Sequence, residues 1–170
     1  MATTFEETYS VTRITRTIAK PHTAVLAKLY SSIKNKEDSG LTIVEALENK
    51  QQFEEATNAH LGPHGFMHFK DFQHGAWMGL YGVHKDRAST RVIFGNPQIA
   101  ITMLKHDVRA GLFVPVECLI VEREDGNTDV VMMKPSGLIA GYKGAGEELK
   151  KAAEMLDQKL DKLWEWVAEE

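Results

Sequence analysis

Cysteine, clustered basic residues and long apolar runs are all scarce in this sequence. The single cysteine, Cys118, has no second cysteine with which to form an internal disulfide, so covalent cross-links do not hold the fold together. The 20 lysine and arginine residues are scattered, and the formal net charge is -4. A surface that binds nucleic acid needs clustered positive charge. We therefore expect neither DNA nor RNA as a partner.

Apolar residues never follow one another for the length that a membrane-spanning helix needs, about 18 in succession. Residues 1–10 also lack the apolar stretch of a secretory signal peptide. Both absences predict a cytoplasmic protein that does not enter a membrane.

Signatures of the common enzyme classes are missing as well. The sequence has no glycine-rich phosphate loop, no serine nucleophile elbow and no Cys-x-x-Cys or His-Glu-x-x-His pattern for a metal. No cofactor is therefore expected. An enzyme that works without a cofactor and a non-catalytic protein both remain open.

What is present is the composition of one globular domain. The chain has 170 residues, of which 43% are hydrophobic and 26% are charged, enough to build a real core. No repeat, low-complexity tract or linker divides it, so we predict a single domain over 1–170. Cys118 lies in the apolar run 114–121, where a small core residue on a strand is expected and a catalytic thiol is the alternative.

Hydrophobic periodicity and turn residues predict both strands and helices. Strands are expected at 9–18, 65–72, 91–94, 112–122 and 128–133, and helices after Pro21, over 42–60 as one or two pieces, after Pro97 and over 147–167. Asp125-Gly126 indicates a β-hairpin between the last two strands. The apolar stripe of the last helix favours packing on the domain's own sheet, with a coiled-coil partner as the alternative.

Several short motifs, taken in order, resemble a known family. They are Phe72-Gln73-His74, Phe94-Gly95-Asn96-Pro97, Gly111-Leu112-Phe113-Val114-Pro115 and the turn Glu124-Asp125-Gly126. Over about 65–140 they resemble the family called domain of unknown function 302. The resemblance implies an α+β fold of two layers, an antiparallel β-sheet covered by helices with a β-α-β(4)-α core. The helical stretch 36–60 is then an insertion, and no established reaction comes with the family.

His74 and Glu117 are the candidate catalytic residues. His74 lies where a strand gives way to Gly75, and a neutral imidazole exchanges protons near pH 7. Gln73 stands where the resembled family commonly has Asp, so no carboxylate precedes His74. Glu117 lies on a mostly apolar strand, where a carboxylate is either paired or has a raised pKa. The alternatives are a structural histidine and a glutamate that faces solvent.

Four further residues are candidates for ligand binding: Phe94, Asn96, Trp77 and Tyr81. Phe94 and Asn96 lie where a strand turns directly into a helix, whose first N–H groups are free to receive an anionic or carbonyl group. Asn96 is equally suited to cap that helix. Trp77 and Tyr81 follow His74 and either line an apolar pocket or belong to the core.

Histidines are concentrated in one segment, since His60, His64, His68 and His74 fall within fifteen residues. On a strand the last three share a face, but such neighbours are spread over about 6.5 to 13 Å. Three of them cannot close on one zinc ion at about 2.0 Å. We therefore expect structural or surface histidines, with a metal site as the alternative.

Taken together, these patterns predict a small-molecule-binding domain. A cofactor-independent acid–base enzyme using His74 and Glu117 is one form of this hypothesis, with the ligand under the helices and Asn96 close by. A non-catalytic homodimeric assembly module and a histidine-based metal-binding protein are the alternatives.

Overall fold

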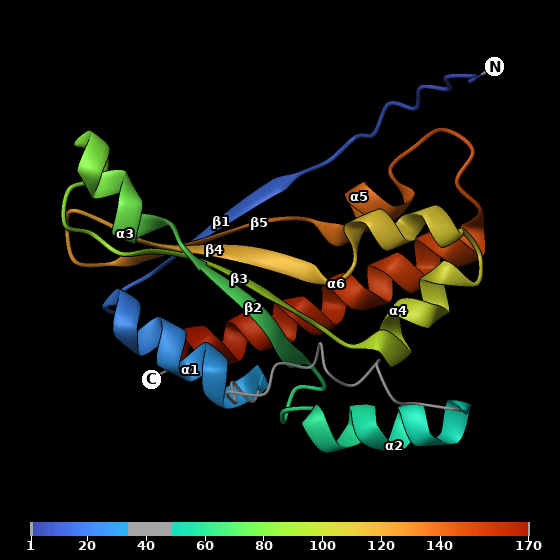
Figure 1. Cartoon of the computed structure of the whole chain (residues 1–170), viewed down its shortest axis with the longest axis horizontal. Helices are drawn as coiled ribbons and strands as arrows, with labels where there is room; N and C mark the ends of the chain where they lie inside the picture. Colours follow the sequence, from blue (N-terminus) through green and yellow to red (C-terminus); the bar gives the residue numbers. More distant parts are fainter. Residues whose placement is uncertain (1, 34–48, 170) are drawn as a thin grey trace.

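A five-stranded antiparallel sheet forms the centre of the fold (Figure 1). The computed structural model describes residues 2–33 and 49–169. Within this part of the chain the strands are β1 (Arg13–Ile18), β2 (Met67–Gln73), β3 (Ser89–Gly95), β4 (Val116–Glu122) and β5 (Thr128–Met133). Their order across the sheet is β1-β5-β4-β3-β2. The predicted α+β fold with its β-α-β(4)-α core is confirmed.

Alternation along the strands gives the sheet one buried face and one uncovered face. In β4, Val116, Cys118 and Ile120 are buried, whereas Glu117 points to the opposite side. Successive side chains of a strand face opposite sides of a sheet, so a strand with one buried face reads as alternating apolar and polar residues. The prediction that Cys118 is a core residue is confirmed, and burial raises the pKa of its thiol.

Helices α1 (His22–Ile33) and α6 (Glu147–Ala168) cover the buried face. The stripe on α6 is buried as predicted and consists of Leu149, Ala153, Leu156, Leu160, Leu163 and Val167. Trp164 joins the stripe and its Nε1 donates to the sulfur of Met132 on β5 at 3.1 Å. The stripe thus packs within its own domain. None of the described helices is long and apolar enough to cross a membrane.

The remaining helices are short and lie around the sheet. They are α2 (Lys50–His60), α3 (His74–Met78), η2 (Gly79–Tyr81), α4 (Pro97–Leu104), η3 (Val108–Phe113) and α5 (Pro135–Ala140). Figure 1 shows α3 (green) and α5 (orange) at opposite ends of the sheet. Together with η2 and η3 they border the face that α1 and α6 leave uncovered.

Two predicted strand starts need correction, because β1 begins at Arg13 rather than at residue 9 and β4 begins at Val116 rather than at residue 112. Residues 112–115 are not part of β4, because the chain forms the 3-10 helix η3 up to Phe113. Asp107 begins that helix, and its side chain accepts from the backbone N–H of Arg109 at 3.0 Å. The first residues of the helical stretch expected over 42–60 lie outside the described residues. Helix α2, within that stretch, begins after Asn49, whose side chain accepts from the N–H of Gln52.

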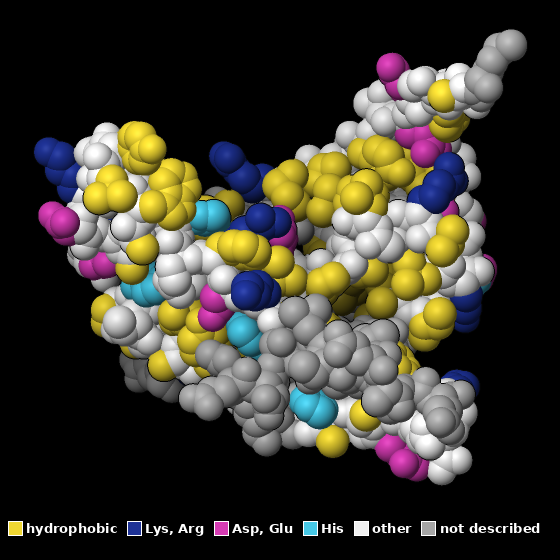
Figure 2. Space-filling view, in the orientation of Figure 1, with side chains coloured by type: hydrophobic (Ala, Val, Ile, Leu, Met, Phe, Trp, Pro, Cys, Tyr) yellow, Lys and Arg dark blue, Asp and Glu magenta, His cyan; other side chains and the backbone are white. Residues whose placement is uncertain are grey.

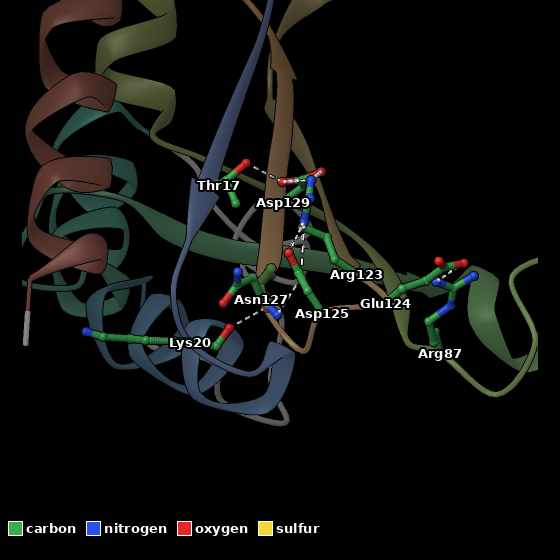
Figure 3. A network of polar contacts seen from close by, with 9 residues as sticks. Thr17, Lys20, Arg87, Arg123, Glu124, Asp125, Asn127 and Asp129 are labelled. Atoms are coloured by element: carbon green, nitrogen blue, oxygen red, sulfur yellow. Dashed lines mark hydrogen bonds and ion pairs between the residues drawn. The ribbon is translucent and has the colours of Figure 1, made fainter.

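The predicted hairpin between β4 and β5 is confirmed (Figure 3). Gly126 adopts a φ of 79°, a left-handed conformation that glycine tolerates best. Arg123 bonds the carboxylates of both Asp125 and Asp129, and Thr17 of β1 donates to Asp129 at 2.6 Å. The hairpin is therefore tied to the edge strand β1 beside it.

Candidate functional site

An apolar cavity of about 290 Å³ lies where β3 turns into α4. Figure 2 shows hydrophobic side chains around a hollow on the face it displays, near the position of α4 in Figure 1. Four parts of the chain contribute: the start of β2, the turn into α4 with α4 itself, the segment before β4 and the middle of α6. The lining residues are Phe66, Phe69, Gly95, Asn96, Pro97, Ile99, Ala100, Met103, Leu104, Gly111, Val114, Pro115, Val116 and Leu156.

Asn96 is the one polar side chain among the described residues of the lining, and its polar atoms are already paired. Its Oδ1 accepts from the N–H of Gln98 at 2.8 Å, which caps α4, as the sequence suggested. Its Nδ2 donates to the carbonyl of Gly65 at 2.9 Å. The cavity therefore presents an apolar surface to anything that enters it.

Two of the motifs that resemble the family meet at this cavity. Gly95, Asn96 and Pro97 belong to the first, and Gly111, Val114 and Pro115 to the second. Gly95 allows the two segments to approach closely, because a Cβ there would lie 3.1 Å from the Cβ of Pro115. The sequence analysis used both motifs to infer a fold, and of its four ligand-binding candidates only Asn96 lines this cavity. The other lining residues of these two motifs could have been found from the motifs themselves, because both motifs belong to the resembled family.

A second hollow, an open groove of about 260 Å³, lies on the uncovered face of the sheet. Its polar residues are His74, Arg91 and Glu117, and its floor includes Leu119 and Val131. Figure 2 shows histidine, basic and acidic side chains close together on this side of the molecule. The two candidate catalytic residues thus line one groove.

Within the groove, Glu117 is paired with Arg91 and His74 lies beside two aromatic rings. Arg91 Nε donates to Oε2 of Glu117 at 2.8 Å, and both side chains are about half exposed. The His74 ring stacks on Phe72 with centroids 6.5 Å apart and meets Trp77 edge-on at 6.0 Å. The catalytic roles of His74 and Glu117 stay predictions.

The candidate residues do not form one site under the helices. His74 and Glu117 lie on the uncovered face, whereas Asn96 lines the apolar cavity. Phe94 is fully buried, and its ring meets those of Phe66 at 5.7 Å and Trp164 at 6.2 Å edge-on. Its surroundings are those of a core residue.

Trp77 and Tyr81 are exposed and do not belong to the core. Trp77 is 51% exposed and Tyr81 is 79% exposed, and their rings meet edge-on at 6.4 Å. Leu80 is exposed as well, and Trp77 meets His74, which lines the groove. Their ligand-binding role stays a prediction.

The clustered histidines each have a separate environment. His60 Nδ1 contacts the carbonyl of Ala56 at 2.8 Å, and His64 Nδ1 contacts the hydroxyl of Ser32 at 2.6 Å. A bulge in β2 between His68 and Lys70 breaks the alternation on which a shared face depends. Across residues 2–33 and 49–169 no three His, Cys, Asp or Glu side chains come close enough to hold a metal ion.

Sequence reasoning missed one polar cluster on the helix-covered side of β2. His68 Nε2 lies 2.8 Å from Oδ1 of Asp71, and the hydroxyl of Tyr30 donates to Oδ2 at 2.5 Å. Burial acts to raise the pKa of Asp71, but the bonds from His68 and Tyr30 outweigh it and lower that pKa. Burial and the neighbouring Asp71 raise the pKa of Tyr30. The three residues tie α1 to β2.

The comparisons with known proteins show the fold and the family. No curated protein matches this chain. A solved structure, described as the crystal structure of uncharacterized conserved protein DUF302 from Bacillus stearothermophilus, superposes with a TM-score of 0.64. The two sequences are 17% identical, and the match covers 91% of this chain and 97% of that one. Similarity at this level of identity shows a shared fold.

A family model described as domain of unknown function DUF302 matches residues 43–163. This range is wider than the 65–140 that the motifs indicated, and it includes α2 and most of α6. It also contains both segments that meet at the apolar cavity. The chain belongs to the DUF302 family.

Proposed function

We propose that this chain binds a small, mainly apolar molecule in the cavity beside α4. The observation that carries the proposal is the apolar lining of this cavity. Among the described residues that line it, Asn96 alone has a polar side chain, and that side chain is already hydrogen-bonded within the protein. Apolar cavities of about 150 Å³ stay dry and take up benzene-sized molecules, and ligand pockets begin near about 300 Å³. A cavity of about 290 Å³ suits a small ligand.

The lining supports binding rather than catalysis at this site. Its described residues include no acid, base or nucleophile, so none of them is suited to proton transfer or covalent attack. The free energy of binding would come from removing apolar surface from water, at about 25 cal/mol per Å². The specificity for one ligand would come from the shape of the hollow.

The test is a fluorescence titration with 1-N-phenylnaphthylamine, a neutral apolar dye that brightens when it leaves water. We expect one dye molecule to bind the wild-type protein. The variant Ala100→Phe places a ring in the cavity and should weaken binding at least tenfold. Ile101→Phe is the matched control, because Ile101 is the next residue of α4, is 57% exposed and does not line the cavity. Equal binding by Ala100→Phe and the wild type would refute the proposal.

A second candidate is a ligand site in the groove on the uncovered sheet face. It is supported by the presence of His74 and Glu117 in one hollow. The same titration separates the two sites, because His74→Ala leaves dye affinity unchanged if the dye occupies the cavity and weakens it if the dye occupies the groove. If His74→Ala unfolds, His74 is a structural residue and the groove is no longer supported as a ligand site.

Homodimeric assembly is a further candidate, supported by exposed hydrophobic side chains on or beside the same face. They are Phe72, Trp77, Leu80, Tyr81, Leu112 and Met133. Large exposed apolar patches often mark protein interfaces. Native mass spectrometry tests this: a dimer that Leu80→Asp dissociates supports it, and a wild-type monomer contradicts it.

A further inference from the structure

A groove lined by basic residues adjoins the apolar cavity. It has a volume of about 340 Å³ and lies between α4 and α6. The side chains of Ile99 and Leu156 line both hollows, so the groove begins where the cavity ends. Met155, which is 61% exposed, adds apolar surface on the α6 side of the groove. A molecule that leaves the cavity past Ile99 and Leu156 would therefore enter the groove.

Positive charge predominates in this groove. Lys105 comes from the end of α4, and Lys151 and Lys159 come from α6, against a single carboxylate, Glu148. Glu148 is engaged, since Lys151 Nζ lies 3.2 Å from its Oε1. Lys105 and Lys159 are exposed and make no ion pair with any described residue.

The helix dipole accounts for only part of this charge. Lys105 follows the last residue of α4, where a cation is stabilised by the negative end of the helix. Lys159 lies in the middle of α6, where the dipole has no such effect. The two lysines come from different helices and meet at the same groove. A negatively charged group placed there would be attracted by both.

We infer that the ligand of the cavity is an amphiphile with an anionic head group, such as a medium-chain carboxylate. Its apolar chain lies in the cavity and its carboxylate lies in the groove, between Lys105 and Lys159. This inference rests on the proposed function, because it assigns the apolar part of the ligand to the same cavity. It adds the chemical class of the head group and the residues that recognise it.

The test compares octanoate with 1-octanol, which has the same chain and a neutral head. Each is used to displace 1-N-phenylnaphthylamine from the wild-type protein at low salt. We expect octanoate to bind about tenfold more tightly than octanol, and the difference to shrink in 1 M salt, where charges are screened. The double variant Lys105→Glu, Lys159→Glu should remove the preference and leave octanol binding unchanged. The double variant Lys70→Glu, Lys85→Glu makes the same change in net charge at exposed lysines outside the groove and should keep the preference.

Each result has one meaning. Equal displacement by octanoate and octanol refutes the anionic head group while the cavity remains the binding site. Dye binding without displacement by octanoate also refutes the inference. If the dye does not bind the wild-type protein at all, the proposed function itself is wrong. If both double variants lose the preference for octanoate equally, that preference comes from the net charge of the protein and not from the groove, and the inference is wrong.

Discussion

Replacing Phe94 by alanine distinguishes a core residue from a ligand-binding one. Phe94 is fully buried and its ring meets Phe66 and Trp164 edge-on. Truncating a buried phenylalanine to alanine costs about 3–5 kcal/mol, because apolar contacts are lost and a cavity is left behind. The two aromatic contacts, which alanine would lose as well, keep the expected cost of Phe94→Ala well inside this range. We therefore expect Phe94→Ala to lower the free energy of unfolding by about 4 kcal/mol.

The assay is equilibrium unfolding in urea together with thermal unfolding. A loss of about 4 kcal/mol corresponds to a fall in Tm of about 8–16 °C for a chain of this length. The slope of free energy against urea should stay the same, which shows that the unfolding transition is unchanged. Leu80→Ala is the control, because Leu80 is 84% exposed and its truncation should change stability by less than about 0.5 kcal/mol. A loss below about 1 kcal/mol in Phe94→Ala, with dye binding abolished, would show that Phe94 contacts a ligand.

Two further predictions concern backbone contact and acid stability. Gly62→Ala should lower the free energy of unfolding by more than about 2 kcal/mol, because its Cβ would lie 1.8 Å from the carbonyl oxygen of Ser32. In the same urea assay Gly79→Ala, which meets nothing within 4 Å, should be neutral or stabilising by up to about 1 kcal/mol. The Arg109 guanidinium beside Asp107 lowers the pKa of that carboxyl to about 2, so its contribution is present above about pH 4 and is lost as the pH falls towards 2. Urea unfolding at pH 7, 4 and 2.5 should show the advantage of the wild type over Asp107→Asn shrinking with acidity, and a constant advantage would contradict this.

Local patterns were enough to predict much of the fold. The hairpin at Asp125-Gly126 depends on residues adjacent in sequence, and the stripe on α6 depends on residues three and four apart. Pro97 and the cap Asn96 fix the start of α4 in the same way. Such features follow from short-range geometry, and the structure confirms them.

Features that depend on the tertiary structure were not predicted. The apolar run at 112–114 reads as the start of a strand, but η3 continues to Phe113 and Val114 contributes to the cavity wall. The sequence left Trp77 as either the wall of an apolar pocket or part of the core, whereas in the structure α3 carries it beside the uncovered face, 51% exposed. The cavity joins Phe66, Pro115 and Leu156, and no pattern within one segment indicates that they meet.

The bulge in β2 also bears on aggregation. Among the described strands β2 lies at one edge of the sheet, and an edge strand exposes backbone groups on which another chain can add as a further strand. The extra residue between His68 and Lys70 interrupts the regular spacing of those groups, and Lys70 places a charge at the same point. On the opposite edge, β1 carries Arg13 and Arg16. Both edges thus resist the strand-to-strand stacking that leads to fibres, which leaves the exposed sheet face as the more accessible surface for self-association.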